Sequence, residues 1–153
     1  MRYLIVTTLV AVLFCCCAKE ESGIPAPGLI VCKVDDVNYS GPGAGAQISG
    51  VTSLSGNDNG KILNISIGTT NFTPPDTFII QGGSATTVGS YSPDNMTTTY
   101  STQVLSGEVG KIIVTEFTSD RYLKGTFEFK AAKMSDTTDV VEITEGGFNV
   151  KIQ

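Results

Sequence analysis

The sequence predicts an all-β fold, either an antiparallel β-sandwich or a small β-barrel of about eight to ten short strands. Apolar and polar residues alternate with a period of two along most of the chain. Turns rich in glycine, asparagine and aspartate separate the alternating segments. No segment keeps the 3.6-residue period of an amphipathic helix, although residues 131–134 are compatible with one helical turn.

The alternation is clearest near the C-terminus, where charged or amide side chains interrupt an apolar series. One-sided strands of this kind are typical of antiparallel sheets with one face in water. We expect Phe127, Phe129, Phe148 and Val150 to form the core. The predicted strands are 29–34, 63–67, 78–80, 111–117, 124–131, 141–144 and 148–152, with turns at 57–60, 107–110 and 145–147.

Residues 82–99 differ from the rest because they contain few apolar side chains and several glycines and threonines. We expect a long loop that holds at most a weak edge strand. The run from Gly41 to Gly45 resembles a phosphate-binding loop only in its glycines, because no Lys-Ser/Thr pair and no helix follow it.

The first residues have the pattern of an export signal. Arg2 precedes twelve uncharged, mostly apolar residues, a stretch too short to cross a bilayer as a helix. Three consecutive cysteines follow, where a bacterial lipobox places the cysteine that receives diacylglycerol and fatty acids such as palmitate. The lipobox spacing alone slightly favours Cys16 over Cys17 as the lipidated residue.

The next residues shift the prediction to Cys17. The run Cys17-Ala-Lys-Glu-Glu21 resembles the surface-export signal of Bacteroidota lipoproteins, which implies lipid at Cys17, an outer-membrane location and exposure at the cell surface. We therefore expect a lipoprotein signal peptide over 1–16, an acylated N-terminus and flexible tether over 17–28, and a single β domain over 29–153. Cys32 would then be the one ordinary thiol, packed as a small hydrophobe.

Composition excludes several functions. The 153 residues hold 10 Lys and Arg against 15 Asp and Glu, without basic runs, which argues against a nucleic-acid partner. The chain has no histidine, so imidazole triads and histidine-ligated zinc sites are excluded. We expect no enzyme activity, no metal and no cofactor.

The mature chain also resembles a known family. The segments Val31-Cys-Lys-Val-Asp-Asp-Val-Asn-Tyr39, Gly89-Ser-Tyr91, Gly125-Thr-Phe-Glu-Phe129 and Ile143-Thr-Glu-Gly-Gly-Phe-Asn-Val150 are similar to those of the DUF6252 lipoproteins of Bacteroidota. The family often shows Asp-Gly where this chain has Asp35-Asp36, and an aromatic residue, often Trp, at the position of Tyr39. The resemblance implies a fold and a location, and it supplies no catalytic residue.

Two kinds of ligand site remain candidates. Tyr91 and Tyr100 flank the long polar loop, and exposed tyrosines can stack on sugar rings or other flat ligands. The carboxylates of Glu128, Glu142 and Glu145 could approach one another as in a glycoside hydrolase. Their positions on or next to solvent-exposed strand faces, however, indicate charges that keep the protein soluble. The turn at 57–60 offers too few oxygen ligands for calcium and is typical of a hairpin.

We therefore expect a noncatalytic binding or accessory module anchored to the outer membrane through its N-terminal lipid. Its partner would be a glycan or small ligand at Tyr91 and Tyr100, or an outer-membrane protein that docks on an edge strand or loop. Separately, Asp136-Thr-Thr138 resembles the O-glycosylation motif of Bacteroidota, which implies a glycan at Thr137 on a loop.

Overall fold

The computed structural model describes residues 23–153, which form ten antiparallel strands and one short 3-10 helix, η1 (Thr102–Val104). The strands are β1 (Leu29–Val34), β2 (Val37–Ile48), β3 (Val51–Asp58), β4 (Lys61–Ile67), β5 (Asp76–Gln81), β6 (Val88–Ser92), β7 (Tyr100–Ser101), β8 (Glu108–Phe117), β9 (Tyr122–Lys133) and β10 (Asp136–Lys151). The all-β prediction is confirmed. The described residues contain no helix that is long and apolar enough to cross a membrane.

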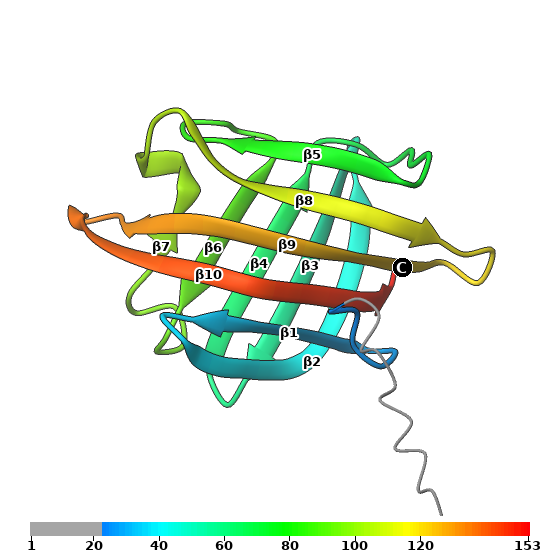
Figure 1. Ribbon diagram of the computed structural model, residues 1–153, viewed down its shortest axis with the longest axis horizontal. Helices are drawn as coiled ribbons and strands as arrows, with labels where there is room; N and C mark the ends of the chain where they lie inside the picture. The colour runs from blue at the N-terminus through cyan, green and yellow to red at the C-terminus, as the bar shows by residue number, and fades with distance from the viewer. Residues whose placement is uncertain (1–22) are drawn as a thin grey trace, which may run out of the picture.

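The strands form two layers that join into a ring (Figure 1). A front sheet contains β5, β8, β9, β10, β1 and the first half of β2, and a rear sheet contains the second half of β2, β3, β4, β6 and β7. The rear strands cross the front strands at a steep angle. The molecule is therefore both sandwich and barrel, because β7 pairs with β9 and closes the ring at one side.

Strand β2 belongs to both sheets and makes the opposite corner. Its residues 37–42 pair with β1, and its residues 43–48 pair with β3. The glycines at 41, 43 and 45 allow close approach, since a Cβ at Gly43 would stand 2.6 Å from a Val150 methyl and one at Gly45 would stand 2.4 Å from Ile152. The glycine-rich run is thus part of a bent strand.

The core lies between the two sheets and follows the predicted alternation. Phe127, Phe129, Phe148 and Val150 are buried, as predicted, and Phe127 stacks on Phe148 with ring centroids 6.3 Å apart. Cys32 is a buried free thiol on the same face of β1 as Ile30 and Val34. Burial raises the pKa of this thiol to about 12, so it carries no thiolate at neutral pH.

Several local expectations were wrong. Residues 145–147 do not form a turn but lie within β10, which only has a bulge between Ile143 and Gly146, and residues 108–110 already belong to β8. Residues 131–133 do not form a helical turn but continue β9, because Ala131 and Ala132 pair with Val141 and Val140 of β10. Residues 82–99 hold an inner strand, not an edge strand: β6 pairs with β4 on one side and with β7 on the other. Its Gly89 leaves room for the Phe129 ring, which would stand 2.6 Å from a Cβ at that position.

Candidate tyrosine pocket

A small cavity of about 280 Å³ opens at one end of the sandwich, beside the turns that join β1 to β2 and β3 to β4. Three tyrosines converge there: Tyr39 from β2, Tyr91 from β6 and Tyr100 from β7. We call this cavity the tyrosine pocket. Its other lining residues are Val34, Asp35, Val37, Asn38, Lys61, Pro93 and Val141.

The pair of residues predicted from the sequence meets in this pocket. The Tyr91 and Tyr100 rings are 6.4 Å apart and tilted by 38°, which fits neighbouring residues that face each other across the β6–β7 pairing. Tyr91 is 7% exposed, so it offers little free surface, whereas Tyr100 is only partly buried. The Tyr100 hydroxyl donates to Asp139, with its two carboxylate oxygens at 3.2 and 3.3 Å.

The phenols in the pocket are neutral at physiological pH, and two polar side chains beside them are available to a ligand. Burial is the main cause that raises the pKa of Tyr91 and of Tyr100, and the hydrogen bond to Asp139 raises that of Tyr100 further. The Lys61 ammonium and the Asn38 amide make no side-chain hydrogen bond or ion pair with another described residue. The pocket therefore combines flat apolar rings with free polar groups at its rim.

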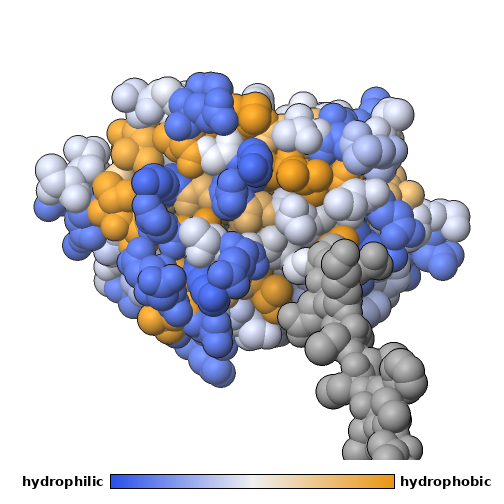
Figure 2. All heavy atoms as spheres, viewed as in Figure 1, coloured by the Kyte–Doolittle hydropathy of each residue, from blue (hydrophilic) through white to orange (hydrophobic). Residues whose placement is uncertain are grey.

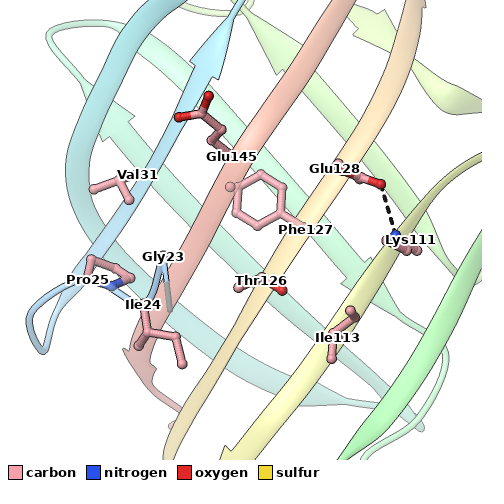
Figure 3. Close-up of a pocket in the computed structure, with 11 residues that line it drawn as sticks. Gly23, Ile24, Pro25, Val31, Lys111, Ile113, Thr126, Phe127, Glu128 and Glu145 are labelled. Carbon is pink, nitrogen blue, oxygen red and sulfur yellow. Dashed lines mark ion pairs between the residues drawn. The ribbon is translucent and has the colours of Figure 1, made fainter. Parts of the chain in front are cut away.

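A larger groove of about 720 Å³ lies elsewhere, on the outer face of the front sheet (Figure 3). The N-terminal residues Gly23–Pro25 border one side, and Val31, Ile113 and Thr126 line its floor. Its charged groups are already paired: Lys111 with Glu128 at 3.1 Å, and Glu145 with Lys33 at 2.7 Å. The tyrosine pocket is the better candidate ligand site, because specific pockets need polar groups that are free to orient a ligand.

A comparison with family models assigns the chain to a protein family. A model described as a domain of unknown function, DUF6252, matches residues 28–150. The chain belongs to the DUF6252 family. No curated protein and no solved structure matches it.

The structure of this chain accounts for the two positions at which its sequence departs from the expected pattern. Asp35 and Asp36 form the β1–β2 turn with φ of 47° and 64°, a left-handed conformation in which glycine is unstrained. The Asp35 carboxylate accepts a hydrogen bond from the Glu142 backbone at 2.8 Å, which ties this turn to β10. Tyr39 fills the aromatic position and is 2% exposed in the core.

Sequence reasoning missed the pocket residues that lie in or next to two hairpin turns, chiefly Asp35, Asn38, Tyr39 and Lys61. A usable signal was present. The turns at 35–36 and 59–60 are both tight hairpins separated by one further hairpin, and alternate turns of an antiparallel meander lie at the same end of a sheet. Asn59 and Gly60 have positive φ, as the hairpin prediction for residues 57–60 requires.

The three carboxylates considered for glycoside hydrolysis lie on the outer face of the front sheet. Glu128, Glu142 and Glu145 are exposed, and each forms an ion pair with a lysine: Lys111, Lys130 and Lys33 respectively. No group of three Cys, Asp or Glu side chains close enough to hold a metal ion occurs among residues 23–153.

Two further predicted sites differ in how the structure bears on them. Cys16 and Cys17 lie outside the described residues. Thr137 is exposed, but it lies in the first residues of β10 and not on a loop, because the β9–β10 turn ends before Asp136. The Asp136 carboxylate accepts hydrogen bonds from the backbone and hydroxyl of Thr138, at 3.0 and 2.7 Å, and these lower its pKa.

Proposed function

We propose that this protein is a noncatalytic binding module held on the outer surface of a Bacteroidota outer membrane by lipid at Cys17, and that it binds glycans or small flat ligands in the tyrosine pocket. The observation that carries the proposal is that the partly exposed Tyr100, with the buried Tyr91 and Tyr39 behind it, lines one cavity beside free polar groups at one end of the sandwich. A sugar ring suits this combination, because its C–H faces stack on aromatic rings while its hydroxyls bond to polar rims.

The size of the pocket limits the ligand. A cavity of about 280 Å³ lies at the lower end of the range for small-molecule sites, roughly 300 to 1,000 Å³. It therefore accommodates one ring or the end of a longer chain. Lys61 and Asp35, of opposite charge, line the same cavity, so the ligand need carry no net charge.

A glycan array probed with the detergent-solubilised full chain tests this function. We expect binding to one class of glycan, lost in Tyr100→Ala and weakened in Lys61→Met. Tyr122→Ala is the matched control, because Tyr122 is a partly buried tyrosine at the start of β9 that does not line the pocket. Binding that survives both Tyr91→Ala and Tyr100→Ala, in variants with native circular dichroism, would remove the pocket from the proposal.

Anchoring is tested separately by membrane fractionation. Replacing Cys17 with serine should release the protein from membranes, whereas replacing Cys16 should leave it attached. Attachment retained in the Cys17→Ser variant would contradict lipid at that residue.

The glycan proposed at Thr137 is tested by mass spectrometry. An unmodified mass for the peptide that contains residues 136–139 would contradict it.

Strand β5 supports a second function, as an accessory that docks on an outer-membrane protein. Among the described residues, β5 pairs with β8 only, so its other edge is without a strand partner, and Ile79 is 40% exposed. An edge of this kind can receive a strand from another protein. A photocrosslinker at Ile79 should then capture one membrane protein from intact cells, while one at Ser55, exposed on β3, should not.

A further inference from the structure

The N-terminal segment Gly23–Gly28 lies on the outer face of the front sheet. The Asn149 side-chain amide donates to the Pro25 carbonyl at 3.1 Å, and the Gly28 amide donates to the Asn149 carbonyl at 2.7 Å. The Gly23 carbonyl covers Gly147 so closely that a Cβ there would stand 1.6 Å from its oxygen. The point at which the chain reaches the domain is therefore fixed on this face, beside the groove of Figure 3.

The chain between the proposed lipid and this point is short. Cys17 precedes Gly23 by six residues, which reach at most about 21 Å when fully extended. The two sheets lie about 10 Å apart, and side chains add to the thickness on both outer faces. Six residues are too few to leave the front face, pass around the edge of the sandwich and bring the rear face to the membrane.

The charge on the front face allows this face to lie close to a membrane surface. Five ion pairs between Lys and Asp or Glu link its strands, and the ten charges of these pairs cancel. Figure 2 shows hydrophilic and hydrophobic side chains interspersed over this face. The pairs are Lys33–Glu145, Lys111–Glu128, Lys124–Glu116, Lys130–Glu142 and Lys133–Asp139.

The excess negative charge lies elsewhere. Residues 23–153 hold eight Lys and Arg against thirteen Asp and Glu, a net charge of −5. The eight acidic residues outside the five pairs all lie in turns, loops or at strand ends, where they border the sheet face without occupying its centre. They are Asp35, Asp36, Asp58, Asp76, Asp94, Glu108, Asp120 and Asp136. An anionic lipid surface would repel these rims more than the neutral face.

We propose that the outer face of the front sheet lies toward the lipid headgroups in the anchored protein, with the groove against the membrane surface. This inference rests on the proposed lipidation of Cys17. The tyrosine pocket lies at the Val34 end of β1, about 17 Å along the strand from Leu29 at about 3.3 Å per residue, so it opens at the side, away from the tether. A ligand in the medium thus reaches the pocket without passing beneath the domain.

Energy transfer to a headgroup-labelled lipid tests this orientation. The lipidated full chain, in vesicles of phosphatidylethanolamine and phosphatidylglycerol, carries one donor dye at Thr126→Cys on the front face or at Ser55→Cys on the rear face. The native Cys32 is buried and unreactive. Because the two positions lie on opposite faces of sheets about 10 Å apart, we expect transfer from position 126 to exceed that from position 55 by about twofold or more.

Two variants isolate the cause. A flexible spacer inserted between Ser22 and Gly23 should remove the difference between the two positions. Gly147→Ala should reduce it, because the added methyl group displaces Gly23 and frees the segment up to Gly28.

Each other outcome overturns the orientation. Equal transfer from both positions in membrane-bound protein would refute it and leave the anchor intact. Protein that does not bind vesicles at all would refute the anchor as well, which distinguishes the two failures. A dye at position 126 that is shielded from iodide without transfer to lipid would show that a second copy of the chain covers this face.

Discussion

Tyr39 holds a hydroxyl group in the core without a hydrogen-bond partner. The oxygen lies over Gly56, where a Cβ would stand only 2.7 Å away, and the Leu63 backbone lies near it without forming a well-aligned hydrogen bond. A buried hydroxyl without a partner costs about 1 to 3 kcal/mol. We expect Tyr39→Phe to raise the free energy of unfolding by about 1 kcal/mol in urea denaturation.

Tyr122→Phe is the control for this change, because its side chain is only partly buried and its substitution should alter stability by less than about 0.5 kcal/mol. A marked loss of stability in Tyr39→Phe would show that the hydroxyl has a partner in solution.

Cys32 makes stability depend on alkaline pH. Its pKa is about 12 in the folded protein against 9.0 for an ordinary cysteine, because burial disfavours the thiolate. A folded-state pKa above the unfolded value gives stability that is complete below pH 9 and is lost as pH rises toward 12. Between pH 8 and pH 10 we expect Cys32 to contribute a loss of about 1.4 kcal/mol, measured by urea unfolding at each pH.

Cys32→Ala supplies the comparison. The variant should be less stable at pH 8, because it leaves a small cavity, but its loss of stability between pH 8 and pH 10 should be smaller by about 1.4 kcal/mol. Tyr39, Tyr91 and Tyr100, whose pKa values are also raised in the folded protein, add a further loss as pH approaches their ordinary value of 10.0, and both proteins share this loss. Parallel pH profiles for the two proteins would contradict the assignment to Cys32.

At the scale of elements, strand β2 depends on residues without side chains at the corner it makes. A Cβ at Gly43 would stand 2.6 Å from Val150 and 2.7 Å from Ile30, both fixed in the core. We expect Gly43→Ala to lower the free energy of unfolding by about 1 to 3 kcal/mol, since overpacking forces neighbours out of their rotamers. Ala44→Ser, next to it and exposed, should change stability by less than about 0.5 kcal/mol.

The same strand shows why some elements could be predicted from the sequence and others could not. Alternation predicted β9 and the end of β10, because their inward positions carry large apolar side chains such as Phe127, Phe129 and Phe148. Strands β2 and β6 carry glycine at inward positions, where Val150, Ile152 or Phe129 from the other layer fills the space. The apolar side chains that fill the core at these glycines belong to other strands. The residues of β2 and β6 themselves therefore show no regular alternation of apolar and polar side chains.

The candidate site was predictable to a similar extent. Tyr91 and Tyr100 were predicted because they flank one loop, and the β6–β7 pairing then brings their rings together. Tyr39 and Lys61 come from other hairpins, and the ring closure that places them beside the pair depends on long-range pairing. Local sequence carries no record of that pairing.

For the whole molecule, ring closure depends on the short pairings of β7 with β6 and β9, which we call the seam. Strand β7 is two residues long, and only its pairing joins β6 to β9 on that side. By contrast, β9 and β10 share a long ladder, and each also pairs with a further strand. The tyrosine pocket lies beside this seam, because Tyr91 of β6 and Tyr100 of β7 line it together with residues of β1, β2, β4 and β10.

Opening of the seam should therefore be the easiest large fluctuation of the fold, and ligand binding should oppose it. In native-state hydrogen exchange we expect the amides of Tyr100, Ser101 and Ser90 to exchange faster than those of Phe127 and Phe148. Addition of a ligand that binds the pocket should slow exchange at the seam by a factor that follows ligand occupancy, because the bound form excludes the open one. Uniform slowing across β9 and β10 would instead indicate binding that stabilises the fold globally, and seam amides as slow as those of the core would show that β7 closes the ring firmly.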